Sequence, residues 1–285
     1  MSKILVFGEI IWDIFPEKKC IGGAPLNFAA HAKKQGAESY MLSAVGGDRL
    51  GLDAVCEVER FGIDTKYITV VQDKPTGQCI VTLDEKMVPS YNLLNDTAYD
   101  VISATEELYK DSFDVVSFGT LALRGEHNVE TVKNVLNNVK FNEVFSDLNI
   151  RAPFYSKETV NFCLKNATIV KISDEELPVV CNLVFGESDF DYKTAARMLS
   201  EKFKQLKIVV ITRGGEGSYA YDCISGNEFS SAGEKVDVVS TVGAGDSFGA
   251  AFLVHYINGK SIQECLNIAT KVSAYVVAHI EAVPD

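Results

Sequence analysis

The stretch from 238 to 252, VVSTVGAGDSFGAAF, places one carboxylate, Asp246, directly after three small residues and ahead of an apolar run. Gly243, Ala244 and Gly245 leave their backbone N–H groups uncovered where the apolar run predicts that a buried helix begins. The helix dipole adds partial positive charge at such a point, so this stretch predicts an anion-binding site. A carboxylate facing an anion site is explained if Asp246 accepts the proton of a hydroxyl group that attacks a bound phosphorus atom.

The same residues also allow plainer interpretations. Asp246 could be a helix cap that stabilises the protein by about 1 kcal/mol, although a purely capping charge is costly at the start of a buried helix. A dinucleotide-binding G-x-G-x-x-G motif would need glycine at position 248, which is Phe248. The sequence contains no G-x-x-x-x-G-K-[ST] motif and neither the H-R-D nor the D-F-G motif of protein kinases.

Short runs rich in β-branched residues alternate with helical patterns along most of the chain. These runs are KILVFG at 3–8, DVVSF at 114–118, EVFSD at 143–147, ATIVKIS at 167–173 and KIVVIT at 207–212. Continuous apolar strands between helices predict a doubly wound, mostly parallel α/β sheet with helices on both faces. Helices are expected from about Pro25 to Gln35 and from Ser261, where Glu264 completes a capping box. The helix after Gly245 is apolar almost all round, which predicts that it is central and buried.

The length and composition predict one α/β domain over residues 1–285, because 47% hydrophobic content can bury one large core. Between about 66 and 99 the pattern changes to strand-like alternation without a helix. We expect this segment, with a part from about 10–20, to form a small β lid. An exposed strand edge could pair with a second copy, so a homodimer through the lid is one expected assembly.

The charge balance is acidic, with 39 Asp and Glu against 27 Lys and Arg and a net charge of −12. This charge repels polyanions, so neither nucleic acid nor an anionic membrane surface is expected as a partner. The seven cysteines are widely spaced without a C-x-x-C motif, which favours free thiols over a zinc or redox site. Glu9 and Asp13 interrupt the apolar N-terminus, and no apolar run is long enough to span a bilayer, so a cytoplasmic location is expected.

Polar or glycine-rich sequence follows the carboxyl ends of four predicted strands. Gly119, Asp147, Ser173 and Thr212 mark these ends. In a doubly wound sheet the ligand binds outside the carboxyl ends of the strands. Each of these residues alone would be an ordinary loop residue, but their joint occurrence favours a binding site at this edge.

Two long motifs in register resemble both signatures of the ribokinase-like (PfkB) carbohydrate kinases. They are GGAPLNFAAHAKKQGAESYMLSAVGGDRLG at 22–51 and TVGAGDSFGAAF at 241–252. DLNIR at 147–151, KISDEEL at 171–177 and TRGGEG at 212–217 also follow the family's order, so the resemblance spans nearly the whole chain. Ala24 stands where ribokinases usually carry Lys, and together with DLNIR and SDEE it makes the chain more similar to fructokinases.

The resemblance implies a catalytic role for the glycine-rich stretch. Asp246 matches the family's catalytic base. The N–H groups of Ala244, Gly245 and Asp246 match its anion hole for the transferring phosphoryl group, and Gly243 belongs to the same motif.

The resemblance further implies that Asp13, Gly23 and Asn27 hold sugar hydroxyls and that Arg151 lies near substrate and phosphate. A carboxylate in an apolar strand, such as Asp13, needs hydroxyl or cationic partners unless an edge strand turns it to water. Asn27 could instead satisfy backbone groups near the helix start. Arg151 could form a surface salt bridge.

ATP and Mg²⁺ are the cofactors that the resemblance implies. Glu176 corresponds to the acidic residue that orients magnesium through water, although Ser173 stands where many relatives have Asn. The positions implied for nucleotide binding are Thr212, Gly214, Gly217 and Thr270. Without the other motifs, Glu176 would be a solvated helix charge and TRGGEG an ordinary turn.

The chain departs from the family pattern at two places. Ser240 replaces the usual Asp of D-T-x-G-A-G-D, and a usual Gly-Ala pair appears as Glu281 and Ala282. In relatives these positions surround a monovalent cation and the adenine. A cation stripped of water depends on anionic and carbonyl oxygens, so we expect little dependence on potassium unless Glu281 substitutes as a ligand.

The function implied is an ATP-dependent sugar kinase that acts on a primary hydroxyl, with fructose as the first choice of substrate. The alternatives are a kinase for another sugar, such as 2-keto-3-deoxygluconate or ribose, and a sugar-binding regulatory protein that has lost catalysis. The intact GAG stretch and Asp246 argue against lost catalysis, whereas Ser240 and Glu281 argue for it.

Overall fold

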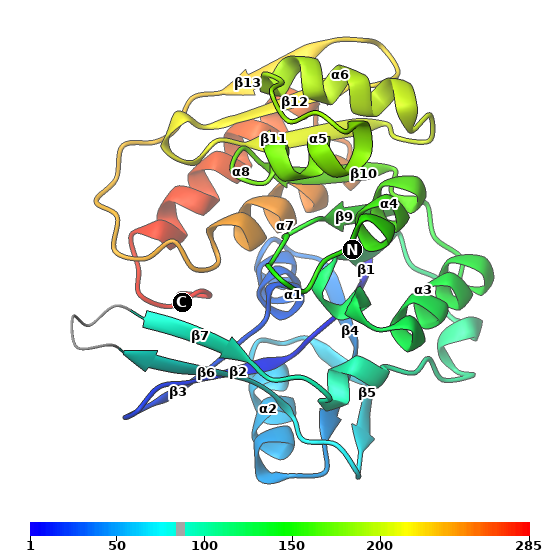
Figure 1. Cartoon of the computed structure of the whole chain (residues 1–285), viewed down its shortest axis with the longest axis vertical. Helices are drawn as coiled ribbons and strands as arrows, with labels where there is room; N and C mark the ends of the chain where they lie inside the picture. The colour runs from blue at the N-terminus through cyan, green and yellow to red at the C-terminus, as the bar shows by residue number, and fades with distance from the viewer. Residues whose placement is uncertain (84–88) are drawn as a thin grey trace.

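A nine-stranded sheet forms the centre of this computed structural model, which describes residues 1–83 and 89–285 (Figure 1). In spatial order the strands are β13 (Glu228–Ser231), β12 (Ser218–Asp222), β11 (Ile208–Thr212), β10 (Ile169–Ser173), β9 (Glu143–Asp147), β8 (Val115–Phe118), β1 (Lys3–Phe7), β4 (Glu38–Gly46) and β5 (Asp64–Val71). All neighbours from β11 to β5 pair in parallel, and only β12 and β13 pair antiparallel. The five strands predicted from sequence are confirmed as β1, β8, β9, β10 and β11.

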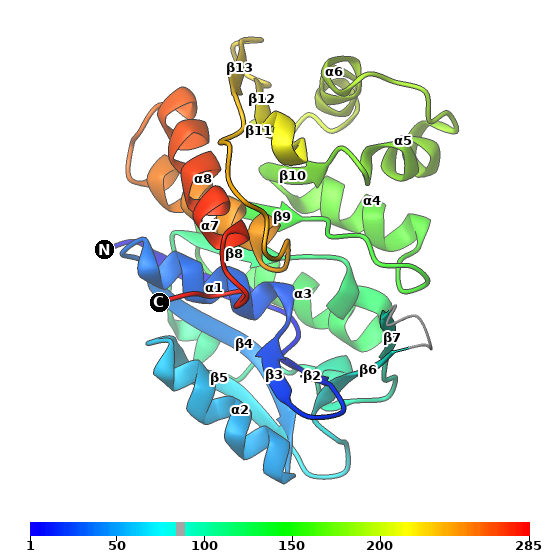
Figure 2. The same ribbon diagram turned by 90° about the vertical axis from the view of Figure 1, so that its left-hand side faces the viewer.

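Helices cover both faces of this sheet, which confirms the doubly wound fold (Figure 2). One face carries α1 (Ala24–Lys34), α2 (Arg49–Arg60), α7 (Ala244–Ile257) and α8 (Ile262–Val277). The other carries α3 (Glu126–Asn138), α4 (Lys157–Asn166), α5 (Leu177–Phe185) and α6 (Tyr192–Lys202). Four short 3₁₀ segments are η1 (Ala98–Val101), η2 (Leu108–Lys110), η3 (Leu121–Arg124) and η4 (Gly214–Glu216).

Alternation along the strands divides the interior into two cores. In β1, Ile4 and Val6 pack under α1, α2, α7 and α8, whereas Leu5 and Phe7 pack under α3 to α6. Side chains with a period of two therefore serve both faces, which explains why these strands read as continuous apolar runs. The helix α7 packs against α1 and α8 on one face of the sheet with residues 247–254 all buried, as its apolar sequence predicted.

The predicted helix boundaries agree closely with the structure. The first expected helix is α1, which begins at Ala24 with Pro25 in its first turn. The capping box at the start of α8 is confirmed, because Ser261 accepts a hydrogen bond from the backbone of Glu264 and returns one through the Glu264 carboxylate. Within residues 1–83 and 89–285, no helix has both the length and the apolar composition that crossing a membrane requires.

A second, four-stranded sheet stands apart from the large one (Figure 1). Its order is β3 (Lys19–Gly22), β2 (Ile11–Ile14), β6 (Gly77–Leu83) and β7 (Pro89–Leu93), with β2 and β6 parallel and the outer pairs antiparallel. The lid boundary expected at 66 was wrong, because residues up to Val71 belong to β5 of the large sheet. Residues 84–88 of the expected lid lie outside the described residues.

The reason for the wrong boundary is that β5 is an edge strand. Tyr67 is buried against the core, while Val70 is 52% exposed, so the strand alternates as a strand of a lid would. Asp48 connects the start of α2 with the segment that leads into the small sheet. Its carboxylate caps α2 through Gly51 N at 2.8 Å and holds Thr76 N at 2.9 Å, immediately before β6.

Candidate active site

A cleft of about 1640 Å³ is lined by the carboxyl edge of the large sheet, the first turn of α7 and strands of the small sheet. Every site residue that the sequence singled out lines this cleft. They are Asp13, Gly23, Asn27, Arg151, Glu176, Thr212, Gly214, Gly217, Gly243, Ala244, Gly245, Asp246 and Thr270. The fold therefore gathers residues from both ends of the chain into one site.

The cleft lies where the strand order of the large sheet reverses. From β1 the order runs to β4 and β5 on one side and to β8, β9, β10 and β11 on the other. Crossovers that leave in opposite directions open a crevice at the carboxyl ends of the strands. Gly119, Asp147, Ser173 and Thr212 stand at the carboxyl ends of β8 to β11, where the sequence predicted them.

The first turn of α7 has the geometry of an anion-binding site. Gly243 precedes the helix with φ of 81°, and a Cβ added there would lie 2.5 Å from the carbonyl oxygen of Ala282. Only glycine fits this position without moving the backbone. The N–H of Ala244 makes a long hydrogen bond of 3.3 Å to Thr241 O, and the N–H groups of Gly245 and Asp246 have no acceptor in the described part of the chain. These groups are available to a bound anion.

Asp246 lies on the same turn and is held by Asn27 of α1. The side-chain amide of Asn27 donates to Asp246 Oδ2 at 2.9 Å, and Asn27 is itself 6% exposed. Burial raises the pKa of Asp246, while the hydrogen bond from Asn27 and the charges of Lys171 and Arg151 oppose that rise. The amide of Asn27 therefore favours the ionised, proton-accepting form of this carboxylate, and the predicted role of Asn27 in holding sugar stays a prediction.

A buried ion pair joins β9 and β10 next to this turn. Lys171 Nζ donates to both carboxylate oxygens of Asp147, at 2.8 and 3.0 Å, and the two residues are register partners. The Lys171 side chain is 5% exposed and that of Asp147 is 16% exposed. Burial raises the pKa of Asp147 to about 6 against the opposing charge of Lys171. Lys171 was not among the residues predicted from sequence, although a lysine inside the apolar strand IVKIS was the available signal.

Glu176 is fixed at the margin of the cleft just before α5. One carboxylate oxygen accepts from Ile150 N at 2.5 Å, and the other accepts from Ser173 N at 2.8 Å. These bonds tie together the loops that follow β9 and β10. Each oxygen retains a second acceptor position, so the carboxylate can also receive a hydrogen bond from water.

Asp13 lies in β2 of the small sheet, with a cysteine beside it on each neighbouring strand. Its register partners are Cys20 in β3 and Cys79 in β6, and all three residues line the cleft. Burial raises the pKa of Asp13, while the positive charge of Arg151 opposes the rise. The exposed Arg151 also acts on Glu9 and Asp246, so it stands among three carboxylates.

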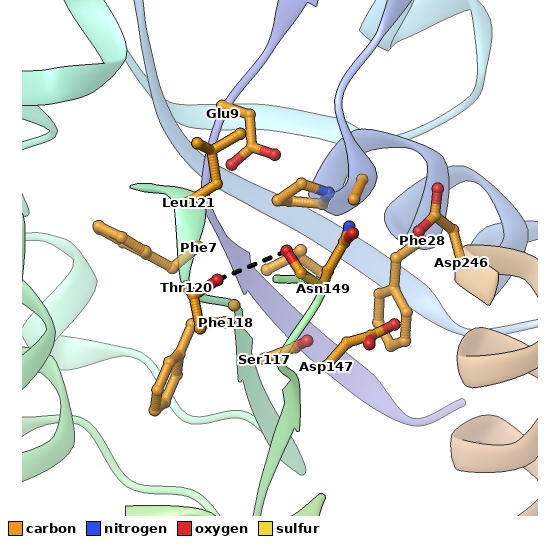
Figure 3. Close-up of a pocket in the computed structure, with 14 residues that line it drawn as sticks. Phe7, Glu9, Phe28, Ser117, Phe118, Thr120, Leu121, Asp147, Asn149 and Asp246 are labelled. Carbon is orange, nitrogen blue, oxygen red and sulfur yellow. Dashed lines mark hydrogen bonds between the residues drawn. The ribbon is translucent and has the colours of Figure 1, made fainter. Parts of the chain in front are cut away.

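A second, smaller cavity of about 30 Å³ adjoins the cleft (Figure 3). Phe7, Phe28 and Phe118 contribute apolar walls, and the acids Glu9, Asp147 and Asp246 reach it from three elements. Glu9 is 3% exposed, and burial raises its pKa to about 7. Glu9 was not among the site residues predicted from sequence, yet a carboxylate two residues after a buried strand was a signal for a site.

A family model of pfkB carbohydrate kinases matches residues 3–284. The chain belongs to the pfkB family of carbohydrate kinases. It is 26% identical to an ATP-dependent 6-phosphofructokinase of Thermoanaerobacterium thermosaccharolyticum over 99% of this chain and 90% of that protein. It is also 26% identical to a fructokinase of Salmonella typhimurium, over 88% and 83% of the two chains. The resemblance predicted from sequence is thereby confirmed.

The structural comparison supports the same fold. A sugar kinase of Pyrococcus horikoshii, solved in complex with ATP, superposes with a TM-score of 0.81 and 24% identity. The superposition covers 98% of this chain and 94% of that one. The ribokinase-like architecture of this pfkB kinase is therefore shared over its whole length.

Large apolar side chains stand exposed on one side of the cleft in this pfkB kinase. Val238, Val242 and Ile280 are 67%, 55% and 68% exposed and line the cleft. They face the same opening as Thr270, whose hydroxyl lies 3.2 Å from that of Ser218. Exposed apolar groups gathered at a cleft favour a ligand with a flat, apolar face. Sequence reasoning did not find them, because apolar residues in a loop carry no sign of their exposure.

The two departures from the family pattern lie on adjacent segments. Ser240 N donates to Val277 O at 3.2 Å, and Ser240 Oγ accepts from Val242 N at 3.2 Å. Glu281 is exposed and lines the same cleft as Ser240. The structure thus places the exposed carboxylate of Glu281 in the same cleft as Ser240.

Proposed function

We propose that this carbohydrate kinase transfers the γ-phosphoryl group of ATP to a primary hydroxyl of a sugar. Fructose is our first choice of sugar, and the product is then fructose 6-phosphate. The observation that carries the proposal is Asp246, ordered by Asn27 at the first turn of α7, beside N–H groups without acceptors in the described residues. The fructokinase among the relatives supports the choice of sugar, and the ATP-bound sugar kinase of the same fold supports the nucleotide.

In the proposed mechanism, Asp246 accepts the proton of the attacking hydroxyl. As the O–H bond breaks, the sugar oxygen bonds to the γ-phosphorus and the bond from that phosphorus to the β-phosphate oxygen breaks, which releases ADP. The N–H groups of Ala244, Gly245 and Asp246 stabilise the negative charge on the phosphoryl oxygens. Asn27 keeps the carboxylate of Asp246 oriented and favours its ionised form before the proton arrives.

The sugar is proposed to lie between the first turn of α7 and the small sheet. Asp13, Gly23, Asn27 and Arg151 would bind its hydroxyls. Asp13, Asp246 and Glu9 line the cleft together with Arg151, whose positive charge acts on all three acids, so this end of the cleft favours a neutral, hydroxyl-rich ligand over a strongly anionic one. The small sheet is proposed as the lid, and its outer strands β3 and β7 as the edges through which a homodimer would form.

The nucleotide is proposed to lie across the glycine-rich turn after β11. Thr212, Gly214, Gly217 and Thr270 would contact its phosphates and ribose side, with the adenine against Val242 and Ile280. Gly217 has φ of 99°, and an added Cβ would lie 2.0 Å from Ser231 O, so this turn requires glycine.

Glu176 fits the predicted role of orienting magnesium through water. Its two oxygens are held by Ile150 N and Ser173 N and keep acceptor positions toward the cleft. When bound with ATP, Mg²⁺ offsets charge on the phosphate oxygens. Ser240 supplies only a neutral hydroxyl, so we propose little dependence on potassium.

The seven cysteines are free thiols, which supports a reducing compartment and the proposed cytoplasmic location.

The test is ATP consumption by the purified protein over a panel of sugars. The panel contains fructose, ribose, 2-keto-3-deoxygluconate and fructose 6-phosphate, because a 6-phosphofructokinase is among the relatives. We expect the highest kcat/KM with fructose. A preference for ribose or 2-keto-3-deoxygluconate would support the alternative sugar kinases. Sugar binding without ATP consumption would support the regulatory protein and overturn the proposal.

A further inference from the structure

Lys171 is buried against the first two turns of α7. Its Nζ lies 3.2 Å from the point that a Cβ on Gly245 would occupy, and its Cδ lies 3.5 Å from the corresponding point on Gly249. Both glycines leave room for the lysine, since any side chain at Gly245 would press on the ammonium. The ammonium therefore lies close to Gly245, one of the residues whose N–H groups form the proposed anion site.

Three carboxylates face this one ammonium. Asp147 holds it by two hydrogen bonds, and Glu176 and Asp246 act on it from the loop before α5 and from α7. Burial lowers the pKa of Lys171, but the three carboxylates outweigh burial and raise it, so the lysine is charged at neutral pH. Without Lys171, the charges of Asp147, Glu176 and Asp246 would lack this opposing charge, and an entering phosphoryl group would be repelled.

A matched ion pair on the same strand shows that holding β9 in place does not require a buried lysine. Lys207 Nζ lies 2.6 Å from Glu143 at the amino end of β9, and the Lys207 side chain is 37% exposed. Burying an ion pair costs desolvation energy that an apolar pair of similar size avoids. The acids of the two pairs are similarly buried, at 16% and 14% exposed, so the pairs differ in the burial of their lysines. The buried lysine lines the cleft and the partly exposed one does not, so the position of Lys171 points to the chemistry of the cleft.

Resting on the proposed function, we propose that Lys171 is a positioning residue for phosphoryl transfer. Asp147 holds its ammonium against the first turn of α7, where its charge offsets Asp147, Glu176 and Asp246 and adds to the N–H groups that receive the γ-phosphoryl group. The ammonium transfers no proton and forms no covalent bond. It acts through its positive charge, which allows the site to bind the negatively charged phosphoryl group.

The experiment compares Lys171→Met with Lys207→Met as the matched control. For Lys171→Met we expect kcat to fall about 10²-fold while KM for the sugar stays within about 3-fold, the range for a lost electrostatic contact at a transfer site. A second readout needs no turnover. Affinity for AMP-PNP, which carries a γ-phosphoryl group, should fall about 10-fold, while affinity for ADP changes less than about 2-fold. Lys207→Met should lower only the melting temperature.

A further variant separates charge from folding. Lys171→Met leaves Asp147 without its partner, so Lys171→Met/Asp147→Asn removes both charges and restores a neutral pair. If the double variant keeps the low kcat and the selective loss of AMP-PNP affinity, the ammonium is required, as proposed. Recovery of both in the double variant would overturn the proposal, as would equal losses of ADP and AMP-PNP affinity.

The proposal for Lys171 and the proposed function can fail independently of each other. If the original protein turned over no sugar, the proposed function would fail, and the ratio of AMP-PNP to ADP affinity would still decide on Lys171. If the original protein is an active kinase and Lys171→Met matches Lys207→Met in both readouts, only the proposal for Lys171 fails.

Discussion

Strand β9 carries an acid at each end, and each acid binds a lysine from elsewhere in the sheet. At the amino end Glu143 binds Lys207, and at the carboxyl end Asp147 binds Lys171. The lysine side chains are 37% and 5% exposed, respectively. The acids are similarly buried, at 14% and 16% exposed, so the two pairs differ in their lysines, and the buried lysine is the one that lies against the first turn of α7.

At the amino edge of the sheet, polar groups form hydrogen bonds between neighbouring segments. Asp114 accepts from Lys3 N at 2.7 Å in an exposed hydrogen bond, and Thr168 Oγ1 donates to Glu143 at 2.6 Å in a partly buried one. At the carboxyl edge burial raises the pKa of Glu9 to about 7 and that of Asp147 to about 6. Burial without full pairing costs stability, and proteins retain such groups where they act on a ligand. The difference between the edges therefore locates the function.

The largest effect is expected from Asp246→Asn at the carboxyl edge. The variant keeps the shape and the contact with Asn27 but loses the proton acceptor, so kcat should fall about 10⁴-fold, the upper range for a general base. Sugar and nucleotide affinities, measured by calorimetry, should stay within a few-fold. A kcat near that of the original protein would remove Asp246 from the mechanism.

Glu9→Gln tests the cost of burying an acid at this edge. The folded protein holds the Glu9 proton up to about pH 7 and the unfolded chain only to about 4.5, so Glu9 lowers stability as pH rises between them. The loss is on the order of 3 kcal/mol. Glu9→Gln should therefore gain stability relative to the original protein as pH rises from 4.5 to 8 in urea unfolding. A difference that does not change with pH would contradict the assignment.

Gly243→Ala tests the shape of the anion site against a matched glycine. Gly243 and Gly186 both have φ of 81°, but an added Cβ meets Ala282 at 2.5 Å only at Gly243 and has open space at Gly186. Both variants should lose about 1 kcal/mol of stability from backbone strain. Only Gly243→Ala should also lose kcat, by about 10²-fold, because the N–H groups move. Equal kcat values in the two variants would show that this turn has no role in transfer.

The periodic parts of the fold were predictable from the sequence. Apolar runs gave β1 and β8 to β11, and the Ser261 and Glu264 pattern gave the start of α8, because local sequence determines strand and cap formation. The lid boundary failed at β5, since alternation identifies a half-exposed strand and does not say to which sheet it belongs.

The candidate site was predictable where a motif marked it. Asp246 and the small residues before it stood out by local chemistry alone. Lys171 and Glu9 did not, because their importance comes from burial and from neighbours distant in sequence. Asn27 was expected at the sugar, and its contact with Asp246 spans 219 positions, which no local pattern contains.

Asp13→Ala tests whether the small sheet serves the sugar and not the nucleotide. We expect KM for the sugar to rise about 30-fold, because hydroxyls lose a charged acceptor, while KM for ATP changes less than about 2-fold. Cys79→Ala, on the neighbouring strand, is the matched control and should have a smaller effect. Equal increases in both KM values for Asp13→Ala would place the sugar elsewhere.

The smallest effect is expected from exchanging the monovalent cation. Ser240 supplies a neutral hydroxyl where relatives carry an acid, so kcat/KM should differ less than about 2-fold among potassium, sodium and a bulky organic cation at fixed ionic strength. Strong, saturable activation by potassium would contradict this expectation. Loss of that activation in Glu281→Ala would then identify Glu281 as the replacement ligand.

We propose that residues at the carboxyl edge of the large sheet transfer a phosphoryl group to a sugar. The most direct measurement is ³¹P NMR of the unmodified protein with Mg-ATP and fructose. We expect the γ-phosphate signal of ATP to be replaced, one for one, by ADP and a sugar phosphate monoester that matches fructose 6-phosphate. Unchanged ATP with every sugar of the panel, or release of inorganic phosphate alone, would contradict the claim.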